Sequence, residues 1–299
     1  MRPGITVCIP SWNGAAFIGE TLAAVARQTV RDLRVLVSVD GNDMATAEAC
    51  RPFMADPRFG LVVQPRRLGW VGNTNALIAA VETGFFAIMP HDDLPEPDWL
   101  ATLLRVLRRQ PQAVCAFGDV EAFGAATGRH VQRPVAGSLT RRMLETVLEQ
   151  HPCVAYRGLV RRRDDADRPL IPTGLPGDVM ADTAWIAELA RRGELRRVPR
   201  VLVHKRFHRG NTHTGWARLP PAARAGSAAA LLHRMRAAAL DAVGRDEAAR
   251  ALVNTATLLR LFGCGATLMP DHDLPDPAVS AAFWRGLPPS DELRPLAAP

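Results

Sequence analysis

Short, mostly apolar runs alternate with stretches of helical periodicity along the first half of the chain. The runs have the length expected of buried strands. They cover residues 5–9, 34–39, 59–64 and 85–89. Between them, apolar residues recur every three to four positions, which predicts helices over residues 15–28, 44–55, 71–83 and 97–109. Strands that alternate with helices predict βαβ units and a doubly wound, parallel sheet.

The pattern changes in the second half. Further apolar runs predict strands over residues 113–117, 154–160 and 198–207, and helical spacing predicts helices over 139–148 and 178–192. Beyond Gly210 the sequence is rich in alanine and predicts two long helices, over 222–242 and 246–262. We therefore expect an α/β domain over residues 1–210 and a helical C-terminal extension over 211–299.

Three of the predicted strands end in polar loops, which cover residues 10–14, 40–43 and 91–93. If these strands are parallel, the loops meet at one edge of the sheet, where α/β proteins bind nucleotides. Trp12 could offer an aromatic face to a base, and Asp40 could accept a hydrogen bond from a base or ribose. Trp12 could equally be a partly exposed packing residue, and Asp40 a helix cap or turn former.

Two adjacent carboxylates, Asp92 and Asp93, come after the apolar run 85–89. Two such groups repel each other unless a cation or a hydrogen-bonding sugar lies between them. A divalent ion at this position would hold a diphosphate. An Asp-Asp turn in contact with solvent is the alternative that the pair alone leaves open.

Composition narrows the class of protein. The 299 residues are 47% apolar and 22% charged, as in ordinary globular proteins. The formal net charge is +7, but the arginines are scattered and aromatic residues make up only 6%, which argues against a nucleic-acid partner. The five cysteines form no CxxC pair and predict reduced thiols. With no apolar stretch of membrane-spanning length and no signal-peptide core, we expect a cytoplasmic protein. Peripheral contact with the inner face of the membrane stays open.

Taken in order along the chain, several segments together resemble the inverting family 2 glycosyltransferases of the GT-A fold. The resemblance covers about residues 4–210. Its segments are 5–14, 28–29, 37–41, 69–75, 90–95 and 182–185. It implies a Rossmann-like, mainly parallel sheet flanked by helices, with a nucleotide-sugar half over about 1–110 and an acceptor half over about 111–210.

The resemblance also implies roles for individual residues. Asp182 would be the catalytic base, and Asp93 and His208 would bind the metal ion. The residues expected to bind the donor are Pro10, Ser11, Trp12, Asn13, Asp40, Asn75 and Asp92. The chain departs from the family pattern at Val39, Pro90 and Ala181, where acidic residues are common, and at Thr74, where arginine is common.

These residues predict a transferase that uses Mg²⁺ or Mn²⁺ and a UDP- or dTDP-sugar. The acceptor would be the hydroxyl of a glycan, a lipid-linked sugar or a small molecule. A single addition is expected because the QxxRW element of processive synthases is absent. Asp182 could instead be a surface or capping residue, and Asp178 competes for the role of base. A catalytically silent GT-A-like scaffold and a sugar nucleotidyltransferase are the alternatives, and the C-terminal helices could form a homodimer.

Overall fold

The protein is described by a computed structural model that covers residues 4–148, 154–164, 166–262, 277–291 and 293. The chain forms two compact units. The first comprises residues 1–134, 153–171 and 193–208, and the second comprises 135–152, 172–192 and 209–299. The first unit contains one mixed sheet, and the second is helical in its described residues.

The sheet of the first unit begins with four parallel strands in the order β3-β2-β1-β4. Their bounds are β1 Ile5–Ser11, β2 Leu33–Val39, β3 Phe59–Val63 and β4 Phe85–Ile88. β1 and β4 are almost entirely buried, and every residue of β2 except Arg34 is buried. Strands covered on both faces need such continuous apolar runs, which is why the sequence predicted them.

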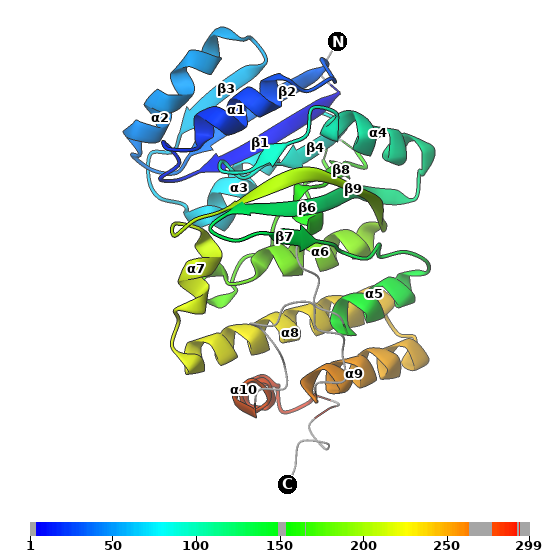
Figure 1. Cartoon of the computed structure of the whole chain (residues 1–299). Helices are drawn as coiled ribbons and strands as arrows, with labels where there is room; N and C mark the ends of the chain where they lie inside the picture. The colour runs from blue at the N-terminus through cyan, green and yellow to red at the C-terminus, as the bar shows by residue number, and fades with distance from the viewer. Residues whose placement is uncertain (1–3, 149–153, 165, 263–276, 292, 294–299) are drawn as a thin grey trace. The chain divides into compact units, whose positions relative to one another are not determined.

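Helices cover both faces of these strands. α1 (Ile18–Ala26) and α2 (Met44–Cys50) connect consecutive strands and contact each other, and α1 lies in front of the sheet in Figure 1. A short 3₁₀ helix, η1 (Arg51–Ala55), comes after α2. The crossover through α3 (Gly69–Ala79) runs in the opposite direction, from β3 to β4. Because such crossovers are right-handed, this reversal places α3 on the other face, where it packs on β1 and β2.

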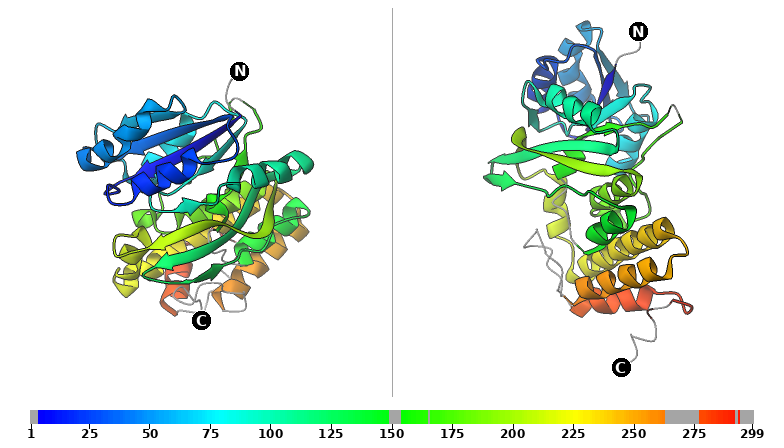
Figure 2. Two further views of the ribbon diagram at one scale, coloured as in Figure 1. Left: turned by 45° about the horizontal axis from the view of Figure 1, so that its top comes forward. Right: turned by 90° about the vertical axis from the view of Figure 1, so that its right-hand side faces the viewer.

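The remaining strands make the sheet mixed. β8 (Leu159–Arg161) lies between β4 and β6 (Ala113–Gly124) and is antiparallel to both. β6 pairs in parallel with the long strand β9 (Glu194–Phe207), and the two lie side by side in both views of Figure 2. Two short strands complete the sheet, β5 (Leu94–Pro95) beside β9 and β7 (Gly128–His130) beside β6.

Two further helices belong to the first unit. α4 (Trp99–Arg109) packs against β6, β8 and β9 through a buried stripe that includes Trp99, Leu103 and Leu107. η2 (Val154–Arg157) precedes β8. The strand predicted over 154–160 is therefore a 3₁₀ turn and then three strand residues, and this difference places Arg157 at the end of the turn.

The second unit is built around α8 (Pro221–Val243), which packs against α5 (Leu139–Leu148), α6 (Ala181–Arg192), α9 (Glu247–Leu261) and α10 (Pro277–Gly286). It also holds η3 (Pro176–Asp178) and α7 (Thr212–Ala217). Leu231, Leu232 and Met235 of α8 are buried. Helices α5 and α6, which the sequence assigned to the α/β domain, thus pack with the C-terminal helices.

No helix in the described part of the chain is long and apolar enough to cross a membrane. The thiols of Cys8, Cys50 and Cys115 are buried and reduced. Cys153 and Cys264 lie outside the described residues.

Candidate functional site

The order of the strands defines a switch point at the carboxyl ends of β1 and β4. From β1 the chain winds toward β2 and β3, and it then returns to β4 on the other side of β1. Open α/β sheets bind ligands at such a reversal, because the loops after the two strands diverge there. The loops over residues 12–17 and 89–93 flank this point.

The three polar loops predicted to meet do so. The backbone N–H of Asp40 donates to the carbonyl oxygen of Ser11 at 2.9 Å, and that of Asn13 donates to Asp43 Oδ2 at 2.7 Å. Asp43 also caps α2 by accepting from the Thr46 N–H. Burial alone would raise the pKa of Asp43, but the hydrogen bonds from Thr46 and Asn13 lower it overall. Asp43 therefore holds the first loop as a carboxylate.

Gly14 brings the first loop against the loop after β4. A Cβ at this position would collide with the Ser11 hydroxyl and would lie 2.7 Å from His91 Cδ2. Only glycine permits this approach. The Ser11 hydroxyl is buried and has no hydrogen-bond partner in the described part of the chain, which makes it a candidate for contact with a ligand.

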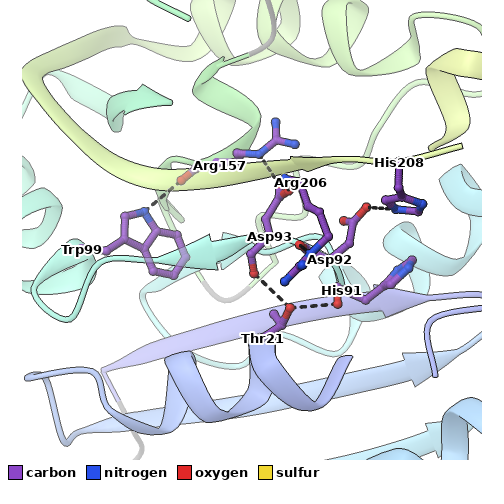
Figure 3. Close-up of polar contacts among 8 residues, drawn as sticks. All are labelled: Thr21, His91, Asp92, Asp93, Trp99, Arg157, Arg206 and His208. Carbon is purple, nitrogen blue, oxygen red and sulfur yellow. Dashed lines mark hydrogen bonds and ion pairs between the residues drawn. The ribbon is translucent and has the colours of Figure 1, made fainter. Parts of the chain in front are cut away.

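Asp92 and His208 form a pair at this edge of the sheet. His208 Nε2 lies 2.9 Å from Asp92 Oδ2, and Figure 3 shows the two side chains pointing toward each other. Both are partly accessible, with 23% of the His208 side chain and 12% of the Asp92 side chain exposed. The Phe17 ring packs on the imidazole with 4.6 Å between ring centroids. The pair offers one carboxylate and one imidazole nitrogen.

Asp93 has a different environment. Its Oδ2 accepts from Arg157 Nε at 2.6 Å, its Oδ1 accepts from the backbone N–H of Arg206 at 3.0 Å, and it is 1% exposed. Burial raises the pKa of Asp93 against the opposing effect of Arg157. Burial by itself would lower the pKa of Arg157, but the Asp93 carboxylate raises it, so the arginine stays charged. The expectation that Asp93 is a metal ligand does not fit these contacts, because both of its oxygens already meet donors of the protein.

Backbone contacts hold the acidic pair in place. The hydroxyl of Thr21, on α1, donates to the carbonyl oxygens of His91 at 2.8 Å and of Asp93 at 2.9 Å. Trp99 Nε1 donates to the carbonyl oxygen of Arg157 at 3.1 Å, which anchors the partner of Asp93. The loop after β4 is therefore fastened directly to α1, and to α4 through Arg157.

Arg206 adds positive charge beside the pair. Its Nε donates to the carbonyl oxygen of Asp92 at 3.2 Å, and its Nη2 donates to Glu20 at 2.8 Å. The guanidinium carbon lies 4.9 Å from the centroid of Phe17 and 4.7 Å from that of Phe123. These rings and hydrogen bonds orient the cation, as cation–π contacts do.

Trp12 and Asp40, predicted to bind a base, are joined by a residue that the sequence reasoning missed. The guanidinium carbon of Arg67 lies 3.5 Å from the centroid of the Trp12 ring, and Arg67 Nε donates to Asp40 Oδ2 at 3.1 Å. Asp40 also accepts from the backbone N–H groups of Leu68 and Gly69. Asp40, which comes directly after β2, thus accepts hydrogen bonds from backbone N–H groups at the start of α3. In the sequence, Arg67 could have been singled out as a candidate because it belongs to an arginine pair, Arg66-Arg67, that comes just before Gly69.

The other residues expected to bind the donor have varied positions. Pro10 lies in β1, next to Ser11. Asn13 is exposed and has a positive φ of 51°. Asn75 is engaged elsewhere, since its amide donates to the carbonyl oxygen of Ile171 at 2.9 Å and accepts from the Ile171 N–H at 2.7 Å.

The described residues contain no group of three or more His, Cys, Asp or Glu side chains arranged to hold a metal ion. Asp92 and His208 supply two ligand atoms. An Mg²⁺ or Mn²⁺ ion bound to a nucleotide commonly takes only one or two protein ligands, with phosphate oxygens and waters completing its shell. The pair fits such an ion only together with a phosphate-bearing ligand.

Asp182, expected to be the general base, lies in the first turn of α6 in the second unit. It is partly buried, and its Oδ1 accepts from the Thr183 N–H at 3.0 Å. The preceding segment holds two non-glycine residues with positive φ, Asp178 at 54° and Met180 at 58°. Burial raises the pKa of Asp178. Both candidate bases therefore lie where an irregular segment leads into α6.

Comparison with known proteins identifies the class to which this chain belongs. The family described as "Glycosyl transferase family 2" matches residues 6–167, which is more than half of the chain. The chain belongs to this family.

Among curated relatives, an "Uncharacterized glycosyltransferase" of Haemophilus influenzae is 23% identical over 118 residues, which are 39% of this chain and 36% of that protein. "Glycosyltransferase GlyA" of Streptococcus pneumoniae is 24% identical over 42% of this chain and 18% of its own length. The aligned part thus spans about a third or less of these relatives.

Solved structures agree in fold. S. aureus TarS 1-349, determined in complex with UDP-GlcNAc, matches with a TM-score of 0.66 and 14% identity over 86% of this chain and 72% of that one. The mannosyltransferase PcManGT from Pyrobaculum calidifontis, in complex with GDP-Man and Mn²⁺, matches with a TM-score of 0.54 and 18% identity over 91% and 78%. The GT-A fold expected from the sequence is confirmed.

Proposed function

We propose that this chain transfers a sugar from a nucleoside diphosphate sugar to an acceptor hydroxyl, with inversion at the anomeric carbon. The observation that carries the proposal is the Asp92–His208 pair at the switch point of the sheet, beside the loop that contains Trp12. Family membership and fold neighbours solved with UDP-GlcNAc or GDP-Man support it. A UDP- or dTDP-sugar is the donor that the sequence resemblance implies.

We propose that Asp92 and His208, in place of Asp93, hold a Mg²⁺ or Mn²⁺ ion together with the donor's diphosphate. A carboxylate suits both ions, and the imidazole favours Mn²⁺ because hard Mg²⁺ prefers oxygen ligands. When bound, such an ion stabilises the negative charge that grows on the leaving diphosphate. The fold neighbour solved with GDP-Man and Mn²⁺ supports a metal ion in this fold.

In this proposal Arg206 also stabilises the negative charge that grows on the diphosphate. Arg206 is held beside Asp92 by its Nε contact and by two aromatic rings, so its charge is oriented before the donor arrives. A preoriented charge stabilises a developing anion without the cost of reorganising solvent. Asp93 and Arg157 would act indirectly, by fixing the loop that carries Asp92.

We propose Asp182 as the general base that removes the proton of the acceptor hydroxyl during its attack. A positioned carboxylate contributes about 10²–10⁴-fold to such a step. Because the hydroxyl displaces the diphosphate directly, one base suffices and the anomeric configuration inverts. Asp178 is the alternative base.

The remaining sequence expectations stay predictions. These are a single addition to a glycan, lipid-linked sugar or small-molecule acceptor and a cytoplasmic location. Peripheral membrane contact and a homodimer through the C-terminal helices stay open. The catalytically silent scaffold is the alternative that a nucleotide-binding and turnover experiment distinguishes.

The test is a thermal-shift panel of the full chain with UDP, dTDP, GDP and CDP, each with and without Mn²⁺. A nucleotide at 100 times its dissociation constant should stabilise the protein by about 2.7 kcal/mol. We expect a shift that requires Mn²⁺ and that Asp92→Asn and His208→Ala abolish. The matched control, Asp98→Asn on an exposed ion pair with Arg200, should keep the shift.

The variant Asp93→Asn tests whether Asp93 has a different role from Asp92. It should lower the melting temperature without ligand, because Arg157 loses its buried partner. Release of nucleoside diphosphate from the corresponding sugar nucleotide, monitored by ³¹P NMR, then tests turnover. Binding without release for any donor and acceptor would favour the scaffold, and no binding at all would sink the proposal.

A further inference from the structure

Arg67 covers the aromatic face that a nucleobase would be expected to use. Its guanidinium carbon lies 3.5 Å from the Trp12 ring centroid, a stacking distance. Half of the Arg67 side chain is nevertheless exposed. The guanidinium therefore lies on the indole and still meets solvent.

One nitrogen of the Arg67 guanidinium, Nε, is hydrogen-bonded to the protein. Nε donates to Asp40 Oδ2, while in the described part of the chain Nη1 and Nη2 have no protein partner. Asp40 is 1% exposed and is held by the backbone N–H groups of Leu68 and Gly69 at 2.6 and 3.1 Å. The anchor of Arg67 is thus a carboxylate that the fold itself orients.

Asp40 is correspondingly ill-suited to read a base. One of its oxygens accepts from Leu68 N–H, and the other accepts from Gly69 N–H and Arg67 Nε. A base N–H donor would have to compete with these contacts. The outer N–H groups of Arg67 have no hydrogen-bond partner among the described residues and can donate to a ligand.

We propose that Arg67 is the residue that selects the nucleobase, by donating from its outer Nη groups to carbonyl oxygen on the base edge. This inference rests on the proposed function, because it concerns the base of the same donor. The edge of the base would meet the outer edge of a guanidinium that is itself stacked on Trp12 and anchored by Asp40. The N–H groups of arginine point outward in the plane of the guanidinium and donate to carbonyl and ring-nitrogen acceptors on a base edge.

The chemistry predicts which bases are accepted. Uracil and thymine carry a carbonyl at C4 and guanine carries one at C6, whereas cytosine and adenine carry an amino group there. An amino group would place its N–H donors against the N–H donors of Arg67. UDP and CDP differ in this carbonyl–amino exchange and in the hydrogen on the adjacent ring nitrogen. GDP and ADP differ in the same two ways and also in the 2-amino group of guanine.

The experiment is isothermal titration calorimetry of the full chain with UDP, CDP, GDP and ADP in the presence of Mn²⁺. For wild type we expect at least one carbonyl-bearing nucleotide to bind about tenfold or more tightly than its amino counterpart. Arg67→Gln, whose amide can both donate and accept, should weaken the preferred nucleotide about tenfold and bring the two members of its pair to within about twofold. Arg66→Gln makes the same change at the exposed neighbour and should behave as wild type.

Each other result overturns the inference in a recognisable way. Unchanged affinities in Arg67→Gln would show that the base is read elsewhere. Tighter binding of all four nucleotides would show that Arg67 only covers Trp12 and must be displaced. If wild type binds none of them, the proposed function fails as well, whereas binding that ignores Arg67 leaves that function intact.

Discussion

Asp92 and Asp93 are neighbours in the chain, yet their carboxylates meet different partners. Asp92 faces His208 and is partly accessible, whereas Asp93 is buried against Arg157. An ion pair buried in this way is costly to break, because the remaining charge keeps its desolvation penalty without its partner. At the residue scale, we therefore predict that the buried aspartate supports the loop and that the more accessible one contacts the donor.

Asn75 provides a second prediction at the residue scale. Both ends of its amide bond the backbone of Ile171, 96 positions away. Asn75→Ala should therefore cost about 1–3 kcal/mol of stability, measured by urea denaturation, and leave nucleotide affinity unchanged. Asn75→Asp should also destabilise the protein, because it places a carboxylate oxygen where the amide donated to the Ile171 carbonyl oxygen. Weaker nucleotide binding at unchanged stability would instead restore the donor-binding role implied by the sequence.

At the scale of elements, one carboxylate ties three strands. Asp119 on β6 accepts from Arg197 on β9 at 2.6 and 2.8 Å and from Arg129 on β7 at 2.5 Å. Burial would raise the pKa of Asp119, but the hydrogen bonds from the two arginines lower it below its usual value. A carboxyl whose pKa falls on folding stabilises the protein above the unfolded-state pKa, and this contribution is lost as pH falls through the folded-state pKa.

Asp119→Asn should accordingly cost about 2 kcal/mol at pH 7, the order of a hydrogen bond to a charged group. The difference from wild type should shrink below about pH 4, where Asp119 begins to be protonated in the unfolded state while its lowered pKa keeps it ionised in the folded state. Urea denaturation at pH 7 and pH 3 measures both values. Asp98→Asn is the control, since that pair with Arg200 is about half exposed and should cost less than about 1 kcal/mol. An equal cost of Asp119→Asn at both pH values would contradict the ion-pair account.

At the scale of the whole molecule, the residues proposed for donor binding and for proton removal belong to different compact units. Asp92, His208 and Arg67 lie in the first unit and Asp182 in the second. Binding and turnover should therefore respond separately to substitution. Asp182→Asn should keep nucleotide affinity within about twofold and lower transfer by about 10²–10⁴-fold.

Calorimetry and a product-release assay on the same preparation make that comparison. Asp178→Asn is the companion variant, and it should leave transfer nearly unchanged. If Asp178→Asn lowers transfer and Asp182→Asn does not, Asp178 is the general base. If Asp182→Asn also abolishes nucleotide binding, the proposed division of roles between the units is wrong.

The order of residues alone was enough to predict the strands β1, β2 and β4, their helices, and the meeting of their polar loops. Burial on both faces demands continuous apolar runs, and the position of the loops results from parallel pairing. The acidic pair and the C-terminal helices were also predictable. These features are local, because each depends on the surface that a segment buries or on the residues next to it in the chain.

Tertiary contacts were needed to establish which aspartate faces His208, what covers Trp12 and how the units divide. Arg157 is 64 positions from Asp93 in the chain, and Arg67 is 27 positions from Asp40. Contacts between such distant residues produce no local pattern in the sequence that could predict them. The short strand β8 pairs antiparallel with two neighbours, although nothing in its own sequence distinguishes antiparallel from parallel pairing. Helices α5 and α6 pack with α8, because an apolar helix face does not encode which of several apolar surfaces it will cover.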